Sequence, residues 1–409
     1  MRLGSIIHQF CQSNNQERLR RIMKIKYGRQ DVTESDIAAV VDVLKSDLLT
    51  QGPVVPLFEK AVCDFTNAKY AVAVNSATSA LHIACMALDL GPGDILWTCP
   101  NTFVATSNAA IYCGAEVDFI DIDKDSYNIS VSELKKRLEI AKKNDKLPKI
   151  VVPVHLSGQS CAMKEIKDLS NKYGFKIIED ASHAIGARYQ NNNIGCCEYS
   201  DITVFSFHPV KIITTGEGGM ALTNDPEISN RLQRHRSHGI TANPHEMSDR
   251  PANEIWNYQQ IGLGYNYRMT DIAASLGLSQ LSRLDEIVKK RHLIAQRYDQ
   301  ELSSLPLTIP FQHQDTYSSY HLYIIRLNLD KITKTQPQIF KEMYENGIMV
   351  NLHYIPVYRQ PFYEKMGFKK GYCPESESYH REALSIPMYP TLTTEEQGYV
   401  IKKFQEIVF

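Results

Sequence analysis

The densest set of residues that could do chemistry lies in the segment Phe205-Ser-Phe-His-Pro-Val-Lys-Ile-Ile-Thr-Thr-Gly-Glu-Gly-Gly219. Lys211 follows Ser206 by five residues and has apolar neighbours on both sides, so we expect its side chain at the floor of a cleft. Burial lowers the pKa of a lysine and leaves an amine that can attack a carbonyl carbon. Lys211 is therefore a Schiff-base candidate, although most lysines are solvated surface charges. The Gly216-Glu-Gly-Gly219 motif has no Lys-Ser or Lys-Thr after it, which a phosphate-binding loop requires, so it is interpreted as a turn into the next strand.

Two other segments could bind a charged ligand. Asp180 ends an apolar run, where an unpaired carboxylate is costly, so it needs a positive partner such as a pyridinium nitrogen. Capping of a following helix is the alternative for Asp180, and residue type alone slightly favours it. The motif Asn75-Ser-Ala-Thr-Ser-Ala80 offers N–H groups and hydroxyls at a predicted helix N-terminus, either as an anion site or as an ordinary cap. An amine, a strand-end carboxylate and an anion cup are together the set that a pyridoxal phosphate enzyme requires.

Short β-branched runs alternate with helical stretches through the first two thirds of the chain. This alternation predicts an α/β fold with a mainly parallel sheet between helices. Ligands of such sheets bind at the carboxyl ends of the strands, which is where Lys211, Asp180 and the Asn75 motif fall. The predicted strands are 70–74, 117–122, 149–155, 176–180 and 202–206.

Helical patterns indicate the domain organisation. Thr33, with Asp36 three residues on, predicts the start of a helix of about three turns. A long, charged helical stretch from 271 to about 302 suits a connector between domains. Beyond it, a helix at about 336–346 and strands at 320–326 and 348–352 predict a smaller α+β domain. We therefore expect an N-terminal extension at 1–22, a large domain at 23–275 and the connector with the small domain at 276–409.

Composition excludes several classes of protein. The 409 residues carry 45 Lys and Arg against 46 Asp and Glu, so there is no basic excess to bind nucleic acid. The nine cysteines are scattered, with no C-x-x-C pair and no histidine at metal-ligand spacing, and we expect reduced thiols and no metal site. Polar residues interrupt the most apolar window, 71–90, and the N-terminus lacks a secretion signal. A cytoplasmic protein without a membrane span is the expectation.

Eight motifs, in order, resemble the sugar aminotransferases of the DegT/DnrJ/EryC1/StrS family. The resemblance runs from about residue 25 to the C-terminus. It implies the architecture of pyridoxal-phosphate-dependent transferases of fold type I, which is that of aspartate aminotransferase, with a large domain and a smaller C-terminal one. The motifs are Tyr27-Gly-Arg-Gln, Leu49-Thr-Gln-Gly52, Asn75-Ser-Ala-Thr-Ser-Ala-Leu81, Thr102-Phe-Val-Ala105, Glu179-Asp-Ala-Ser-His-Ala184, the Lys211 segment, Arg236-Ser-His-Gly239 and Gly264-Tyr-Asn-Tyr-Arg-Met269.

The resemblance also implies roles for individual residues. Lys211 holds the cofactor and is the catalytic residue, and Asp180 pairs with the ring nitrogen. The other implied cofactor contacts are Phe103 and Ser182 on the two ring faces, His183 at the 3-hydroxyl, Ala77, Thr78 and Ser206 at the phosphate, Gln159, and Asn266 from a second subunit. A homodimer with shared active sites follows from the role of Asn266.

Within the family, the motif sequences resemble most closely those of the aminotransferases of the pseudaminic acid pathway. These enzymes use L-glutamate to aminate C4 of a UDP-linked 4-keto-6-deoxy-N-acetyl-hexose. Substrate contacts are expected from Thr50, Gln51, Gly52, His353 and Tyr354, with a structural role as the alternative for the histidine. Three alternatives to this function stay open. The first is an aminotransferase for another nucleotide 4-keto sugar, of the perosamine or 4-amino-arabinose type. The second is a sugar 3-dehydratase, although members of that branch have His at the position of Lys211. The third is a non-catalytic sensor.

Overall fold

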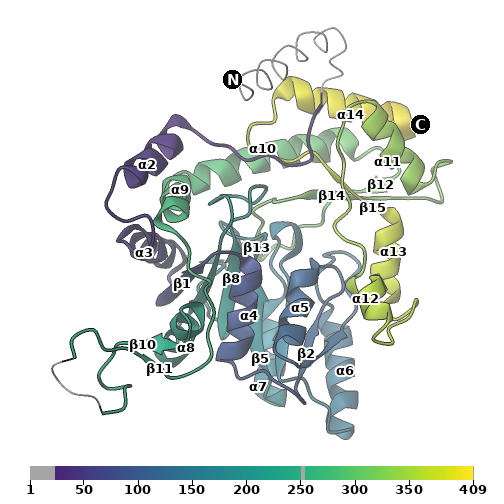
Figure 1. The fold of residues 1–409 in the computed structure, drawn as a ribbon. Coiled ribbons are helices and arrows are strands. Elements are labelled where there is room, and N and C mark those ends of the chain that lie inside the picture. Colours follow the sequence, from purple (N-terminus) through teal and green to yellow (C-terminus); the bar gives the residue numbers. More distant parts are fainter. Residues whose placement is uncertain (1–23, 250–253, 409) are drawn as a thin grey trace, which may run out of the picture.

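The computed structural model describes residues 24–249 and 254–408. The expected extension at 1–22 lies outside the described residues. The centre of the molecule is a seven-stranded sheet of order β1-β9-β8-β5-β4-β2-β3, flanked by helices (Figure 1). Strand β9 runs antiparallel to both of its neighbours, and the other strands are parallel to one another. The bounds are β1 Tyr70–Val74, β2 Ile95–Thr98, β3 Glu116–Phe119, β4 Ile150–Val152, β5 Lys176–Asp180, β8 Ile202–Ser206 and β9 Gly219–Thr223.

The strands confirm the predicted α/β sheet with some changes of length. Strands β1, β5 and β8 have the predicted bounds. Strand β4 is shorter than the predicted run at 149–155, and β3 begins one residue before the predicted run at 117–122 and ends three residues before its end. Strand β2 was not predicted, because its four residues form too short a run to show a period. The glycine-rich motif does turn the chain into a further strand, β9.

Helices cover both faces of the sheet. Alternate side chains of a strand point to opposite faces, and here both faces are apolar, as a buried parallel sheet requires. In β1, Val72 and Val74 join the core under α4, α5 and α8, whereas Ala71 and Ala73 join the core under α3, α6 and α7. The bounds are α3 Val54–Thr66, α4 Ala77–Ala87, α5 Val104–Tyr112, α6 Val131–Lys143, α7 Met163–Tyr173 and α8 Pro226–Arg236.

The predicted connector helix at 271–302 is in fact two helices. Helix α9 is Asp271–Leu281 and helix α10 is Leu284–Leu302. The apolar spacing continues across the break and therefore does not mark it. Arg283 leaves the helical conformation and donates hydrogen bonds to Asp31 and Asp36. These partners lie about 250 positions away in the sequence, so no local pattern could reveal them.

The C-terminal part has its own three-stranded antiparallel sheet of order β12-β14-β15, packed against α10, α11 and α14. Helix α11 confirms the prediction at 336–346. The predicted strand at 320–326 begins only at Tyr323, and the one at 348–352 forms isolated bridges instead of a strand. The bounds are β12 Leu307–Thr308, β14 Tyr323–Leu327, β15 Ala383–Ile386, α11 Gln336–Glu345, α13 Pro374–Glu382 and α14 Thr394–Val408.

The remaining elements lie outside the two sheets and the helices that cover them. Helix α2, Glu34–Leu44, begins with the predicted capping box of Thr33 and Asp36 and packs on α9. An arm with strands β10 and β11 projects from the body at the lower left of Figure 1. Within the described ranges, no helix is long and apolar enough to span a bilayer, and no cluster of three potential metal ligands occurs. The other bounds are β6 Arg188–Tyr189, β7 Asn192–Asn193, β10 Ile240–Thr241, β11 Gln259–Gln260, β13 Thr316–Tyr317, η2 Leu156–Gly158, η3 Val357–Arg359 and α12 Pro361–Glu364.

Candidate active site

A cleft of about 590 Å³ lies at the carboxyl ends of β1, β5 and β8, and residues of the C-terminal part close its other side. This is the edge of the sheet at which the sequence analysis expected chemistry. Ten of the predicted site residues line the cleft together: Ala77, Thr78, Phe103, Asp180, Ser182, His183, Ser206, Lys211, His353 and Tyr354.

The first functional group of the cleft is the N-terminus of α4. Ser76 is the N-cap, and its hydroxyl accepts the N–H of Ser79 at 3.1 Å. The N–H groups of Ala77 and Thr78 have no acceptor within the helix because they belong to its first turn. A helix N-terminus with free N–H groups and nearby hydroxyls can bind an anion. Ser76 thus fits the capping interpretation of this motif, and Ala77 and Thr78 fit the anion-site interpretation.

A glycine lets the sheet approach this cup closely. Gly219, the first residue of β9, pairs with Ser206 at the end of β8. A Cβ atom on Gly219 would lie 2.5 Å from the backbone nitrogen of Ala77, which no side chain can tolerate. The absence of a side chain therefore allows Ser206 and the first turn of α4 to line one cup.

Lys211 lies in the loop between β8 and β9. The loop is closed at its base, because the Phe207 N–H donates to the Gly218 carbonyl at 2.9 Å and the Thr215 N–H to the Phe207 carbonyl at 3.0 Å. Burial lowers the pKa of Lys211 to about 8, and the negative charge of Asp180 opposes part of that shift. About a tenth of the amine is thus uncharged at pH 7, far more than for an ordinary lysine, and the uncharged form is the nucleophile.

Asp180 is 4% exposed at the end of β5. One carboxylate oxygen, Oδ2, accepts the hydroxyl hydrogen of Thr106 at 2.7 Å, and Oδ1 accepts the N–H of Ser182 at 3.1 Å. The bond from the Ser182 N–H resembles the hydrogen bond of a helix N-cap, which was the alternative role for Asp180, but no helix follows Asp180. Both partners are neutral, so the carboxylate keeps capacity for a cation in the cleft.

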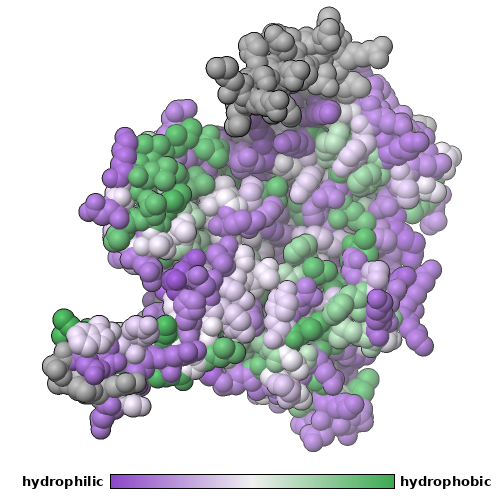
Figure 2. All heavy atoms as spheres, viewed as in Figure 1, coloured by the Kyte–Doolittle hydropathy of each residue, from purple (hydrophilic) through white to green (hydrophobic). Residues whose placement is uncertain are grey.

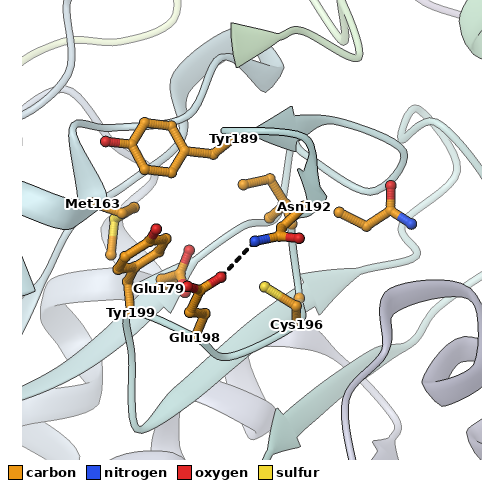
Figure 3. Close-up of a pocket in the computed structure, with 10 residues that line it drawn as sticks. Met163, Glu179, Tyr189, Asn192, Cys196, Glu198 and Tyr199 are labelled. Atoms are coloured by element: carbon orange, nitrogen blue, oxygen red, sulfur yellow. Dashed lines mark hydrogen bonds between the residues drawn. The ribbon is translucent and has the colours of Figure 1, made fainter. Parts of the chain in front are cut away.

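The opposite side of β5 is a separate buried network. Glu179 accepts hydrogen bonds from the His155 ring at 2.7 Å and from the hydroxyls of Ser200 and Thr203. Burial raises the pKa of Glu179, but these bonds together hold it below its usual value. Figure 3 shows Glu179 at a small pocket with Tyr189 and Tyr199. Because neighbouring residues of a strand face opposite ways, Glu179 braces the strand that presents Asp180.

The other wall of the cleft is rich in histidines and aromatic side chains. The Nδ1 atom of His183 accepts the N–H of Ser157 at 3.3 Å, and its Nε2 atom lies 3.3 Å from the Tyr354 hydroxyl. His353 hydrogen-bonds Ser385 at 2.8 Å, so this residue has a structural contact as well as a place in the cleft. Burial and the charge of Lys211 lower the pKa of His353 to about 3 and that of His183 well below its usual range.

Five predicted residues do not line this cleft. Gln159 is buried elsewhere, and its side-chain oxygen accepts the N–H of His313 at 3.0 Å. The single chain therefore gives Gln159 a structural contact where the resemblance implied a cofactor contact. The other four are Thr50, Gln51 and Asn266, which are exposed, and Gly52, which is half-buried. Thr50 is bridged to Thr270, four residues beyond Asn266.

The structure also adds residues to which the sequence gave no role. Thr106, Asn351 and His321 line the cleft, as does Tyr27 of the first family motif. Thr106 has a local signal, because it lies one helical turn beyond Thr102, to which its hydroxyl is bonded at 2.7 Å. His321 has none, because it stands in a run that predicted a strand.

These groups fit pyridoxal phosphate. Lys211 supplies an amine, and Asp180 supplies a carboxylate with neutral partners. The cup at the N-terminus of α4 supplies N–H groups and hydroxyls for a phosphate. Phe103 is 60% exposed and offers a flat apolar face, and a cofactor would cover it. The glycine contact at Ala77 independently indicates that the cup is built for close approach of the backbone.

Comparisons with known proteins agree with this fit. The model of the DegT/DnrJ/EryC1/StrS aminotransferase family matches residues 30–405. The chain is 37% identical over 377 residues to the UDP-4-amino-4,6-dideoxy-N-acetyl-β-L-altrosamine transaminase of Campylobacter jejuni, covering 92% of this chain and 95% of that one.

Two solved structures are similar to the fold. Helicobacter pylori PseC, an aminotransferase involved in the biosynthesis of pseudoaminic acid, superposes with a TM-score of 0.86 at 30% identity, covering 94% of this chain and 99% of that one. The putative sugar aminotransferase Spr1654 of Streptococcus pneumoniae, in its pyridoxal phosphate form, gives a TM-score of 0.83 at 28% identity, with 94% and 98% covered.

Proposed function

Since the chain belongs to the DegT/DnrJ/EryC1/StrS aminotransferase family and is a pyridoxal-phosphate-dependent sugar aminotransferase, we propose that it transfers the amino group of L-glutamate to C4 of a UDP-linked 4-keto-6-deoxy-N-acetyl-hexose in the cytoplasm. The product is then UDP-4-amino-4,6-dideoxy-N-acetyl-β-L-altrosamine, for pseudaminic acid biosynthesis. The observation that carries the reaction type is the meeting of Lys211, Asp180 and the α4 cup in one cleft. The similarity to the altrosamine transaminase of Campylobacter jejuni and to Helicobacter pylori PseC supports the choice of sugar.

Each residue has a separate task in this proposal. When bound, pyridoxal phosphate supplies an aldehyde that takes up the amino group and a ring that accepts electrons. Lys211 would hold it through Nζ, and the same atom would carry a proton to and from the reacting carbon. Asp180 keeps a proton on the ring nitrogen, and Thr106 holds the Asp180 carboxylate in place. Phe103, Ser182 and His183 surround the ring, and Ala77, Thr78 and Ser206 bind the phosphate.

The C-terminal part supplies candidate substrate contacts. His353 and Tyr354 line the cleft there, which supports their proposed role in sugar contacts. Thr50, Gln51 and Gly52 lie at the surface, so we assign them to the substrate site of a partner subunit, together with Asn266.

A homodimer is part of the proposal, because Asn266 does not reach the cleft of its own chain. Two groups of apolar side chains are exposed on this chain. Figure 2 shows one group of them over α2, at the upper left. They are Ile37, Leu44, Leu48, Leu49 and Leu57 near α2, and Ile255, Trp256, Tyr258 and Leu263 on the arm. Faces of this kind mark interfaces between proteins.

The shared site can be tested by mixing two inactive variants. Lys211→Ala and Asn266→Ala chains, refolded or co-expressed together, form mixed dimers in which one of the two sites has both native residues. Activity restored toward a quarter of the wild-type value supports the shared site. Activity that stays at the level of the separate variants contradicts it.

The substrate is tested with a panel of UDP- and dTDP-linked 4-keto sugars, each with L-glutamate. Formation of 2-oxoglutarate, the mass of the product and its stereochemistry at C4 are measured. We expect turnover with the UDP-linked N-acetyl 4-keto sugar. Failure with every UDP-N-acetyl 4-keto sugar refutes the substrate and leaves the family assignment standing.

A further inference from the structure

We propose that His321 is a catalytic residue of the sugar half-reaction, and that its ring donates a hydrogen bond from Nε2 to the ketone oxygen of the bound 4-keto sugar. The inference rests on the proposed function and adds a residue to it. His321 lines the cleft together with Lys211, and its side chain is 4% exposed.

The first support is the hydrogen-bonding capacity of the three buried histidines of the cleft. Both ring nitrogens of His183 have partners, Ser157 and Tyr354, and both of His353 have partners, Ser385 and Asn351.

His321 differs from the other two. Its Nδ1 atom is buried without any hydrogen-bond partner, and no residue in the described ranges bonds its Nε2 atom. Buried polar atoms in native proteins nearly always have a partner, and those that do not call for a functional explanation. Of the three rings, only that of His321 is free to bind a ligand.

The second support is the charge and tautomer of the ring. Burial, then His183 and then Lys211 lower the pKa of His321 well below its usual range, so the ring is neutral. A neutral imidazole carries one N–H. A buried N–H without an acceptor is rarer in proteins than a buried acceptor without a donor, so the hydrogen belongs on Nε2 and not on the enclosed Nδ1.

The third support is the rigid attachment of His321. Arg291, a fully buried side chain of α10, donates from Nη1 to the carbonyls of Tyr320 at 3.0 Å and His321 at 3.2 Å. The N–H of His321 donates to the carbonyl of Ser157 at 2.8 Å. The ring is packed against His183 with centroids 4.3 Å apart. Such a side chain is held in place before the substrate arrives, as a contact to a reacting atom requires.

The ketone oxygen is the acceptor that suits this donor. A neutral imidazole N–H polarises a carbonyl without transferring its proton, so no charged imidazole is needed. The charge of Lys211 acts on the His321 ring, and the Lys211 amine must approach the reacting carbon. A carboxylate of the amino donor would instead favour a charged ring, which burial here opposes.

The test separates the two half-reactions by stopped-flow absorbance of the bound cofactor. For His321→Phe, we expect the step with L-glutamate to change less than about threefold and the step with the 4-keto sugar to slow about 100-fold, the effect of removing one such donor. His321→Gln, which keeps an N–H, should recover about tenfold of that loss. Binding of the keto sugar to Lys211→Ala chains, with and without His321→Phe, gives a readout that needs no turnover. The dissociation constant should be about tenfold larger in the double variant than in Lys211→Ala alone.

The matched control is His292→Phe. The ring of His292 packs on Tyr317 and Tyr320 in the same region, has the Ser318 carbonyl as its partner, and does not line the cleft. Both half-reactions should be unchanged in this variant. Equal slowing of both half-reactions in His321→Phe, or no slowing of the sugar step, overturns the inference. Failure of the proposed substrate is seen separately, as absent turnover in the wild type, and the variants are then compared on the 4-keto sugar that the wild type accepts.

Discussion

The two walls of the cleft are built in different ways. On the sheet side, Asp180 and Ser206 stand at the last positions of strands, and Thr78 stands in the first turn of a helix. On the opposite side, His321 and His353 stand in irregular segments, and their positions depend on contacts with residues far away in the sequence. The first wall is thus fixed by local secondary structure, whereas the second is fixed by packing between the two parts of the chain.

The contact between the two walls is very close at one position. Gly158 has φ near +98°, and a Cβ atom there would lie 2.2 Å from the Ser319 hydroxyl and 2.9 Å from the His183 carbonyl. The Ser319 hydroxyl also donates to that carbonyl at 2.7 Å. The position of the histidine wall therefore depends on a residue without a side chain.

The largest expected effect is on the sheet-side wall. Lys211→Ala should lower turnover by at least about 1,000-fold and remove the visible absorbance of the bound cofactor, because both depend on the amine. Circular dichroism and the melting temperature should stay near the wild-type values, because the Lys211 side chain faces the cleft and makes no hydrogen bond to any of the residues that the structure describes. A fully active Lys211→Ala enzyme would refute the site.

Asp180→Asn should have the next largest effect, a loss of turnover of about 100-fold or more, because an amide cannot keep the ring nitrogen protonated. Thr106→Val is the matched variant. It leaves the charge and removes one hydrogen bond, so we expect a loss of only about tenfold. The comparison is made by steady-state kinetics with saturating cofactor. Equal losses in the two variants would argue for a structural role of Asp180.

Gly158→Ala tests the contact between the walls. Its positive φ and the overlap with Ser319 and His183 should lower the free energy of unfolding by about 2–4 kcal/mol. Gly174→Ala is the control, because Gly174 has φ near +83° but no atom within 4 Å of the added Cβ. The control should cost about 1 kcal/mol. Urea denaturation measures both, and equal values would show that the contact at Gly158 is not tight.

The smallest effect is a pH dependence. The pKa of Lys211 is about 8, below the usual value for lysine, so the free amine increases as the pH rises through 8. Capture of pyridoxal phosphate by the cofactor-free enzyme should therefore speed up about tenfold from pH 7 to pH 9 and then level off, by the proton equilibrium alone. Stopped-flow absorbance follows the reaction. A rate that is still rising steeply above pH 10 would mean an ordinary lysine and contradict the burial argument.

The difference between the walls also explains which predictions from sequence are accurate. Strands β1, β5 and β8 and the cap of α4 have local patterns, and Asp180, Ser206 and Thr78, which these patterns mark, line the cleft together. His321 was missed because a histidine in an apolar run carries no sign of its surroundings. The break between α9 and α10 was missed for the same reason, since Arg283 binds residues far from it in sequence.

The closed base of the loop between β8 and β9 limits how Lys211 can move. The Phe207 backbone is tied to Gly218 and Thr215, and the Lys211 N–H donates to the His208 carbonyl at 2.9 Å, so the backbone at Lys211 is restrained and the amine moves mainly on its four-carbon side chain. Every carbon that exchanges a proton with the amine must then lie on the arc that this side chain sweeps. A change in reach would follow from lengthening or shortening the side chain, as in Lys211→Arg, and not from loosening the loop.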